Sequence, residues 1–447
     1  MADHGSVLDS ALSDGAQALA PELIQLRRVL HQHPEVGLQL PLTQQIVLDA
    51  LAGLELEVSL GNSTTSVTAV LRGAAGGPAV LLRGDMDGLP ITEASGLDYA
   101  SVEQGAMHAC GHDLHTAMLV GAAKLLVANR DALAGDVVFM FQPGEEGWDG
   151  AGHMLREGVL DAAGQRVAAA YGMHVMASID SGTFTTRPGT LMAASAALRV
   201  TVHGAGGHGS APHHAKDPVS VAAQLVGDLQ TLITRRFDVF DPVVLTVGSF
   251  HAGTARTIIP DRATFDATIR TFSDVAQERI EFEAIRLCEN VGAAYGLEVE
   301  ANFTREYPIT FNAAEHAKFA ASVVSNTFGD ERYEPMAAPQ PGAEDFSRVL
   351  AEVPGCYLML GARVGTALPV ADNHSPRVLF DESVLPDGAL LHAQLAVQAL
   401  RRDAERQAAR SDSQRPGTGS SSDRSRPASQ PTVPAGRTIT PSSSANS

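Results

Sequence analysis

The amino-acid sequence predicts an α/β fold: a mostly parallel sheet with helices on both faces, interrupted by an inserted α+β domain. Up to residue 192, short and continuously apolar segments alternate with helical segments, a pattern typical of strands that are buried on both faces. From residue 193 to residue 305 the strands become half-buried in pattern, and afterwards the first pattern resumes. With 447 residues, the chain is also long enough for two domains.

Three apolar segments of strand length stand in the first part of the chain, at residues 79–82, 136–141 and 167–171. Each is followed by a polar segment that contains glycine: RGDMDGLP, QPGEEG and GMHV. The helices expected here span residues 20–30, 42–52 and 110–129. Because ligands bind beyond the carboxyl ends of parallel strands, we expect the polar residues after these strands to form a site.

Residues 193–305 are predicted to form a unit with the order βαββαβ, which is the ferredoxin-like arrangement. Its expected strands and helices, in chain order, are residues 196–202, 217–235, 243–250, 262–272, 275–295 and 297–304. The chain then returns to the main domain with a helix, a strand and a closing helix at residues 313–327, 357–360 and 387–402. The main domain is therefore expected to be discontinuous, with residues 1–192 and 306–403.

Residues 404–447 differ from the rest of the chain. They are rich in Ser, Pro and Arg and contain no aromatic residue. Such a segment buries too little apolar surface to order itself, so we expect a disordered tail.

The overall composition narrows the possible partners. A formal net charge of -19 argues against nucleic acid, whose phosphates would be repelled. No apolar run is long enough to span a bilayer, so no membrane partner is expected. The three cysteines, Cys110, Cys288 and Cys356, are odd in number and far apart, which suggests no disulfide framework. A reducing cytoplasm is the expected location.

The segment MHACGHDLHT, residues 107–116, places Cys110 and His112 two positions apart with a glycine between them. A thiolate and an imidazole that close can both reach one metal ion. The alternative is a buried cysteine beside the helix-capping Asp113, because free cysteine is usually a small core residue. This segment alone leaves both interpretations open.

Further residues of ligand type follow the predicted strands: Glu145 and Glu146, His174, and His374 in the segment NHSP. Such a mixture of S, N and O donors suits Zn and also accommodates Mn, Co or Ni. Five donors allow two ions to share the set, the usual arrangement for metal-assisted hydrolysis. One glutamate would then bind metal while its neighbour takes a proton from water. The alternative for the glutamate pair is a solvated acidic turn.

These segments resemble those of the metal-dependent amidohydrolases that include hippurate hydrolases, indole-3-acetyl-amino acid hydrolases and other N-acyl-amino acid amidohydrolases. Further segments that match the family are RGDMDGLP, GAGGHGSAPH, TIRTF, GAEDFS and LMLGA. Aminoacylases and carboxypeptidases with co-catalytic metals are relatives of that family. The motifs occur in the family's order from about residue 30 to residue 374. The metal ligands that the resemblance implies are Cys110, His112, Glu146, His174 and His374. It also implies Glu145 as the general base and Asp87 as a residue that steadies a ligand.

The resemblance also assigns residues of the inserted domain. His208 matches a histidine that polarises the scissile carbonyl; the alternative is a solvated histidine in a glycine-rich turn. Arg270 matches a position that holds a substrate carboxylate, to which its planar fork is suited; the alternative is a surface ion pair. The segment AGTARTIIP places Thr257 where the family often has a substrate-binding asparagine, a departure that bears on substrate positioning.

Together these features imply hydrolysis of the amide bond of N-acyl amino acids, hippurate-like or with other acyl groups, by metal-activated water and a glutamate base. Two divalent ions per subunit are expected, Mn or Zn first and Ni or Co as alternatives. The resemblance implies a homodimer through the inserted domain, with its histidine reaching the partner's site. Two other functions stay open: a dipeptidase or carboxypeptidase, and a catalytically inactive metal-binding or regulatory homologue.

Overall fold

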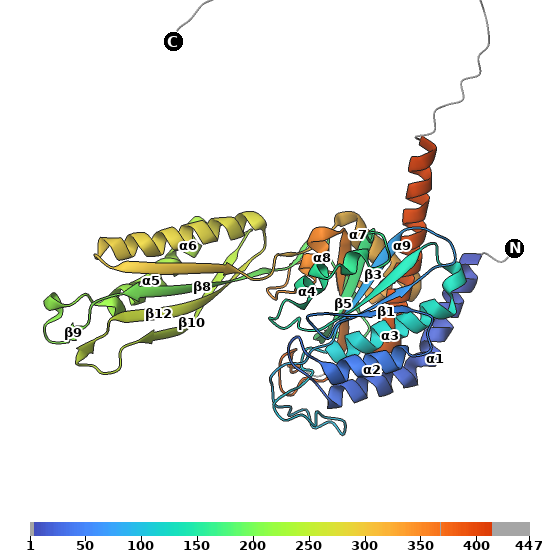
Figure 1. The fold of residues 1–447 in the computed structure, drawn as a ribbon, viewed down its shortest axis with the longest axis horizontal. Helices are drawn as coiled ribbons and strands as arrows, with labels where there is room; N and C mark the ends of the chain where they lie inside the picture. Colours follow the sequence, from blue (N-terminus) through green and yellow to red (C-terminus); the bar gives the residue numbers. More distant parts are fainter. Residues whose placement is uncertain (1–3, 367, 414–447) are drawn as a thin grey trace, which may run out of the picture. The chain divides into compact units, whose positions relative to one another are not determined.

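The computed structural model describes residues 4–366 and 368–413. An eight-stranded sheet, in the order β1-β2-β4-β3-β5-β16-β6-β15, forms the centre of the main domain (Figure 1). Its four central strands are parallel: β4 (Asp136–Gln142), β3 (Ala79–Asp85), β5 (Ala169–Asp180) and β16 (Gly355–Arg363). The flanking strands are β1 (Glu57–Leu60), β2 (Val67–Leu71), β6 (Phe184–Thr186) and β15 (Tyr333–Pro335).

The sheet as a whole is mixed: four strand pairs are parallel, in agreement with the expected mostly parallel sheet, and three are antiparallel. The strand pairs β1–β2, β2–β4 and β16–β6 are antiparallel. The sequence analysis also missed β2, although all of its residues are buried. It did not reveal β1, β6 and β15, because β1 is exposed along its whole length and the other two have three residues each. Such strands lack the apolar run that marks a strand buried on both faces.

Helices cover both faces of this sheet, as predicted. One face packs against α1 (His4–Gln32), α2 (Pro41–Leu51), α3 (His112–Ala128), α7 (Ala314–Phe328) and α9 (Leu385–Ser413). The other packs against α4 (Gly150–Arg156) and α8 (Ser347–Glu352). Every residue of β3 is buried, with Val80 and Leu82 facing the first layer and Leu81 the second. Continuous apolar sequence in β3 therefore reflects burial on both faces.

The first helix is longer than expected, because it begins at His4 and not near residue 20. Leu8, Leu12 and Ala16, four residues apart, are buried in the main core. This stripe is narrow and is separated by polar residues, so its helical period is weak in the sequence.

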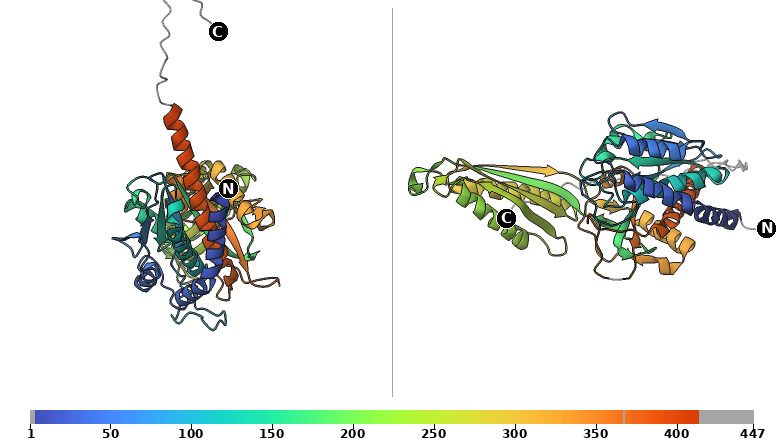
Figure 2. Two further views of the ribbon diagram at one scale, coloured as in Figure 1. Left: turned by 90° about the vertical axis from the view of Figure 1, so that its right-hand side faces the viewer. Right: turned by 90° about the horizontal axis from the view of Figure 1, so that it is seen from below.

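The closing helix is also longer than predicted. It extends to Ser413, past residue 403, so the expected tail is helical over its first part. Helix formers such as Ala, Glu, Gln and Arg dominate this extension, which explains the continuation. The helices α9 and α1 lie side by side (Figure 2), and the amide of Gln394 donates to Asp9 at 3.0 Å. The remainder of the predicted tail, residues 414–447, lies outside the described residues.

A separate four-stranded sheet has the order β10-β12-β8-β13 and is antiparallel throughout. Its elements are β8 (Ala194–His203), α5 (Pro218–Arg236), β10 (Val243–Ala252), β12 (Arg262–Thr271), α6 (Asp274–Ala294) and β13 (Glu298–Arg305). The helices α5 and α6 cover one face of this sheet (Figure 1), and their apolar side chains form its core. Two short strands, β9 (Gly207–His208) and β11 (Ile258–Ile259), pair with each other.

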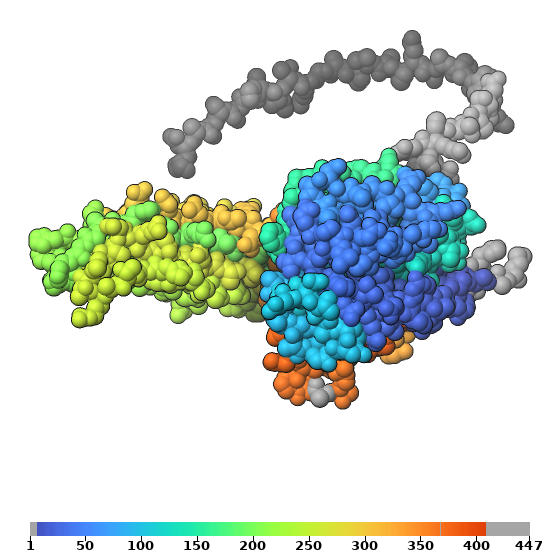
Figure 3. Space-filling view, turned by 60° about the horizontal axis from the view of Figure 1, so that its bottom comes forward, coloured from blue at the N-terminus to red at the C-terminus, as the bar shows by residue number. Residues whose placement is uncertain are grey.

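The loop after β3, around residues 90–105, lies beside the segment that carries His374 (Figure 3). The backbone N–H of Ala94 donates to the carbonyl of Pro376 at 2.7 Å, which ties the two together.

None of the helices in the described part of the chain has the length and apolar character that a membrane span requires.

The early start of α1 can be tested with two substitutions. Leu12 is fully buried whereas Val7 is 57% exposed in the same helix. We expect Leu12→Ala to lower the free energy of unfolding by roughly 2–5 kcal/mol, the usual range for a buried leucine. The control Val7→Ala should change it by less than about 0.5 kcal/mol. Urea unfolding curves measure both; equal values for the two variants would mean that the first turns of α1 do not pack.

Candidate metal centre

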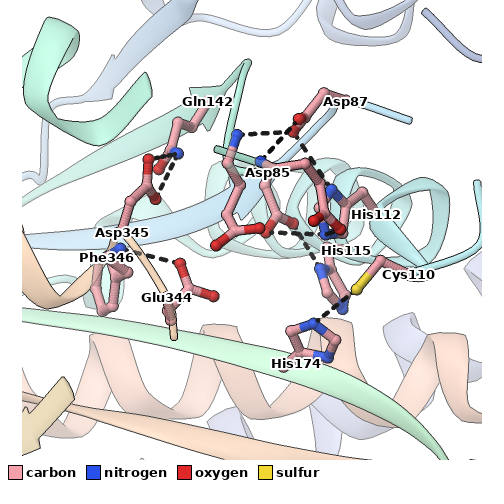
Figure 4. Close-up of polar contacts among 12 residues, drawn as sticks. Asp85, Asp87, Cys110, His112, His115, Gln142, His174, Glu344, Asp345 and Phe346 are labelled. Carbon is pink, nitrogen blue, oxygen red and sulfur yellow. Dashed lines mark hydrogen bonds and ion pairs between the residues drawn. The ribbon is translucent and has the colours of Figure 1, made fainter. Parts of the chain in front are cut away.

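Side chains from distant parts of the chain meet at the carboxyl ends of the central strands. They are Cys110 before α3, His112 at its first position, Glu146 in the loop after β4, His174 in β5 and His374 in the loop after β16. The sulfur of Cys110 lies 3.3 Å from Nε2 of His174 and 3.2 Å from Nε2 of His374. Nε2 of His374 is 3.2 Å from Oε1 of Glu146. The five predicted ligands therefore converge around Cys110. Figure 4 shows three of them, Cys110, His112 and His174.

His174 was expected to follow the third strand, but it lies inside β5, which continues to Asp180. A polar residue ended the apolar pattern in the sequence, whereas the backbone goes on pairing with β16 as far as that aspartate. Pairing of β5 with β3 stops at Gly172, which stands opposite Arg83. His174 therefore lies two residues beyond the end of that pairing.

Two unusual backbone conformations aim these side chains. Gly111 has φ of +86°, and a Cβ there would meet Cγ2 of Val175 at 2.3 Å, so only glycine fits between Cys110 and His112. His374 itself has φ of 68°, which is uncommon for a residue with a side chain. Its neighbour Asn373 donates to the carbonyl of Val175 at 3.0 Å and thereby ties this loop to β5. Such conformations are typical of functional sites.

The donor set fits divalent metal ions on physical grounds. Among the described residues, both ring nitrogens of His112 and Oε1 of Glu146 are buried without a hydrogen-bond partner. Burial holds the pKa of His174 well below its usual value, so its imidazole is neutral and offers a lone pair. Burial also raises the pKa of the Cys110 thiol. The thiolate that would bind metal is therefore favoured only when a cation lies beside it.

Two groups of candidate ligands can be distinguished. Cys110, His112 and His174 place one donor atom each within 4.8 Å of one another, and so do Cys110, Glu146 and His374. Cys110 belongs to both groups, and the five residues together would hold two divalent ions. Sulfur, imidazole and carboxylate donors together suit Zn, Mn, Co or Ni.

Asp87 connects the loop after β4 to the start of α3. Its carboxylate accepts the backbone N–H groups of Glu145 and Glu146 at 3.0 and 3.1 Å. The same carboxylate lies 3.4 Å from Nδ1 of His112. A carboxylate beside the second nitrogen of an imidazole fixes the direction in which the first nitrogen points. Asp87 therefore lies beside one predicted ligand, and its steadying role stays a prediction.

Glu145 is not a solvated acidic side chain, since it is only 7% exposed. Its carboxylate lies close to those of Glu344 and Asp345. Burial, and then the neighbouring charge of Glu344, raise the pKa of Glu145 well above its usual value. A raised pKa is what a carboxylate needs in order to accept and return protons near neutral pH.

A buried ionic network underlies this site, and no role was predicted for its members. The guanidinium of Arg83 bonds to Asp85 at 2.7 Å, to Glu344 at 2.8 Å and to Asp345 at 3.1 Å. Gln142 accepts from the same guanidinium at 3.0 Å. An arginine within an otherwise apolar strand was the available signal, because a buried charge requires partners.

A cavity of about 570 Å³ opens beside the candidate ligands. Glu145, His174 and Arg270 are among the residues that line it, together with Met176 and Met359. Among the described residues, the guanidinium of Arg270 bonds to the hydroxyl of Thr268 and the carbonyl of Ile269 and pairs with no carboxylate, so the alternative of a surface ion pair is not observed. The cavity thus combines candidate ligands, a buried glutamate and a guanidinium.

His208 and Thr257 do not line this cavity. They lie together where β9 and β11 pair: Ile258 stands opposite His208, and the carbonyl of Thr257 accepts the N–H of Gly209 at 2.8 Å. His208 is exposed, and its Nδ1 lies 2.8 Å from the hydroxyl of Ser210. The structure of one chain therefore does not bring these two predicted residues to the candidate centre.

Comparison with known proteins identifies the family. Residues 81–398 match the family described as "Peptidase family M20/M25/M40". Thermostable carboxypeptidase 2 of Saccharolobus solfataricus is 37% identical over 391 residues, which are 87% of this chain and 98% of its own length. IAA-amino acid hydrolase ILR1-like 2 of Arabidopsis thaliana is 36% identical over 388 residues, 86% of each chain.

Two Bacillus subtilis proteins extend this comparison. N-acetylcysteine deacetylase is 34% identical over 386 residues, 86% of this chain and 98% of its own length. A solved structure of the YXEP protein, described as a dinuclear metal binding peptidase from the M20 family, is similar with a TM-score of 0.74 and 31% identity. The similarity covers 86% of this chain and 99% of that one.

The two neighbouring glutamates should differ in metal binding. Oε1 of Glu146 lies within reach of His374 and of His112, at 3.2 and 4.0 Å. We expect Glu146→Gln to bind less metal than the unchanged protein, whereas Glu145→Gln keeps its full complement. Elemental analysis of the purified variants gives the ions per chain. Exchanged phenotypes would reverse the assignment of the pair.

Proposed function

This chain belongs to peptidase family M20/M25/M40, and on that premise we propose that it is a metal-dependent amidohydrolase that cleaves the amide bond of N-acyl amino acids. The observation that carries the proposal is the convergence of five donors next to a buried glutamate in one cavity. Relatives named as an IAA-amino acid hydrolase and a deacetylase support the acyl amino acid as substrate class.

Two divalent ions, Mn or Zn first, would be held by Cys110, His112, Glu146, His174 and His374. When bound, they would polarise the scissile carbonyl and lower the pKa of a water molecule. The residues around them set the geometry. Asp87 directs the ring of His112, and the pairing of β5 with β16 directs His174.

Glu145 is proposed as the general base. Its side chain lines the cavity and is buried among carboxylates, which keeps its pKa raised. It would accept a proton from the attacking water and pass it to the nitrogen of the leaving amino acid. The peptide carbonyl of Glu145 accepts the hydroxyl of Tyr307 at 3.0 Å, which fixes the backbone of this residue.

Arg270 is proposed to bind the carboxylate of the leaving amino acid. Its guanidinium lines the cavity and presents several N–H donors, of which one bonds to the hydroxyl of Thr268 at 3.0 Å. A free carboxylate on the substrate can accept two parallel hydrogen bonds from such a fork. The cavity volume of about 570 Å³ is in the range of small-molecule sites.

A carboxypeptidase or dipeptidase is the second candidate, because the chain is 37% identical to thermostable carboxypeptidase 2. Both substrate classes present an amide bond next to a residue with a free carboxylate, and they differ in what precedes that bond. A catalytically inactive homologue is not supported, since the relatives are named as enzymes and the donor set is complete. A cytoplasmic location would keep the Cys110 thiol reduced.

The proposal is tested by hydrolysis assays on metal-reconstituted protein. Hippurate, N-acetyl amino acids and dipeptides should be compared by kcat/KM, and we expect the N-acyl amino acids to be preferred. Glu145→Gln should lower kcat by about 10²–10⁴, the usual contribution of a general acid–base group. The exposed Glu334→Gln serves as the control and should keep full activity. Preference for dipeptides would favour the peptidase, and no turnover of either class would refute the proposal.

We further propose that the protein forms a homodimer through the four-stranded sheet. The strand β10 is an edge of that sheet, and its side chains Val244 and Phe250 are 44% and 39% exposed. Pairing of two such edges would cover them. In that dimer His208 would reach the cavity of the partner subunit and polarise the scissile carbonyl, with Thr257 beside it.

Mixed dimers test this arrangement. His208→Ala and Glu145→Ala should each be inactive while binding metal. After subunit exchange, a mixed dimer contains one site in which both groups are intact, so part of the activity should return. Native mass spectrometry establishes that exchange has occurred. A mixture that exchanges but stays inactive would show that His208 does not act across the interface.

A further inference from the structure

We propose that His115 is a positioning residue: it fixes the candidate ligands His112 and His174 without binding an ion itself. It is the third histidine of the segment MHACGHDLHT, and no part of the proposed reaction uses it. The inference rests on the proposed function, because it concerns the same metal centre. His115 is 1% exposed and lies within 4.8 Å of Asp85 and His112, a set that resembles a further ligand group.

Both ring nitrogens of His115 are already engaged, and Figure 4 shows this histidine beside Asp85. Nε2 accepts the backbone N–H of Val175 at 2.8 Å. Because a backbone N–H only donates, Nε2 carries no proton and its lone pair is used. The proton therefore sits on Nδ1, which lies 2.5 Å from Oδ1 of Asp85. Neither nitrogen has a lone pair left for an ion, so His115 is not a ligand.

The bond to Val175 explains how His115 acts on His174, the preceding residue. Along β5, pairing with β3 ends where Arg83 stands opposite Gly172. Beyond that point the imidazole of His115 takes up the N–H of Val175 in place of a strand neighbour. The carbonyl of Val175 accepts Nδ1 of His174 at 2.7 Å, which leaves Nε2 of that ring facing Cys110. Fixing the backbone of Val175 thus fixes the direction of the His174 ring.

The ring of His115 also packs against both candidate ligands, whose own centroids lie 6.1 Å apart. Its centroid lies 5.4 Å from that of His112, with the planes at 28°, and 4.8 Å from that of His174. His112 and His115 stand three positions apart on α3 and so share one face of the helix. A single side chain therefore holds a helix residue and a strand residue at a set separation.

The other end of this chain of contacts is anchored in the buried network. Oδ2 of Asp85 accepts from the guanidinium of Arg83 at 2.7 Å, and the carbonyl of Asp85 accepts the hydroxyl of Thr116 at 2.8 Å. Asp85 is completely buried. The carboxylate cannot turn away from His115 without breaking its bond to Arg83, and the bond from Thr116 fixes the backbone of Asp85. The imidazole is therefore held from both sides.

The test measures metal affinity of metal-depleted protein by competition of Zn²⁺ with a chelator. His115→Phe keeps an aromatic ring of similar size but removes both hydrogen bonds. We expect it to weaken Zn²⁺ binding by about 10–100-fold, the usual effect of losing a residue that orients a ligand. The number of ions bound at saturation should stay unchanged. His115→Gln offers one donor and one acceptor again and should lose less affinity, and it serves as the readout if the phenylalanine variant does not fold.

His316→Phe is the matched control. His316 is a buried histidine on α7 whose Nδ1 lies 2.9 Å from the hydroxyl of Tyr171, in another part of the core. We expect this variant to melt at a lower temperature with unchanged affinity for Zn²⁺. If His115→Phe also lowered only the melting temperature, the positioning role would be refuted.

Two further outcomes are distinguishable. If His115→Phe lost one ion per chain at saturation, His115 would be a ligand and the inference would be wrong. If the unchanged protein bound no Zn²⁺ tightly, the proposed metal centre would fail, and this inference with it. Tight binding in the unchanged protein combined with unaltered binding in both His115 variants would refute the inference alone.

Discussion

The buried guanidinium of Arg83 holds together the strand ends on which the candidate centre is built. It bonds to Asp85 on its own strand, to Gln142 on β4 and to the carboxylates of Glu344 and Asp345. Removing these charges from water is unfavourable, and only a complete set of hydrogen bonds compensates for it. The planar guanidinium with its five donors meets that demand where the point charge of lysine would not. The register of the central strands is thereby fixed by charge as well as by apolar packing.

The same network shapes the electrostatics of the cavity. Glu344 and Asp345 are drawn toward Arg83, and this places their charge beside Glu145. Burial together with these neighbours raises the pKa of Glu145. The two acidic residues that bind the guanidinium of Arg83 therefore also disfavour the ionised form of Glu145. The Asp85 carboxylate, which also binds this guanidinium, contacts the histidines of α3: it lies 2.5 Å from Nδ1 of His115 and 3.5 Å from Nε2 of His112.

The sequence predicted the parts of this protein that leave a local pattern. Cys110 and His112 stand two positions apart, and Glu146 follows an apolar strand, so their convergence could be expected from parallel-sheet geometry. The network around Arg83 could not, because its bond to Glu344 joins residues 261 positions apart. The contact of His115 with Val175 is of the same kind. The fully exposed strand β1 and the narrow apolar stripe of Leu8 and Leu12 likewise left no pattern strong enough to be recognised.

The way in which the four-stranded sheet is attached affects how the chain can fold. Its first and last strands are neighbours, with Ala196 opposite Arg305. Beside this pair, the N–H of Ser195 in β8 donates to the carbonyl of Tyr307 at 2.9 Å. The chain therefore leaves the eight-stranded sheet and returns to it at adjacent points. Once these strands have paired, the intervening residues behave as a short closed link, for which the entropy of loop closure is small. The late strand β16 can then join β5 without the delay that so long an excursion of the backbone would otherwise impose.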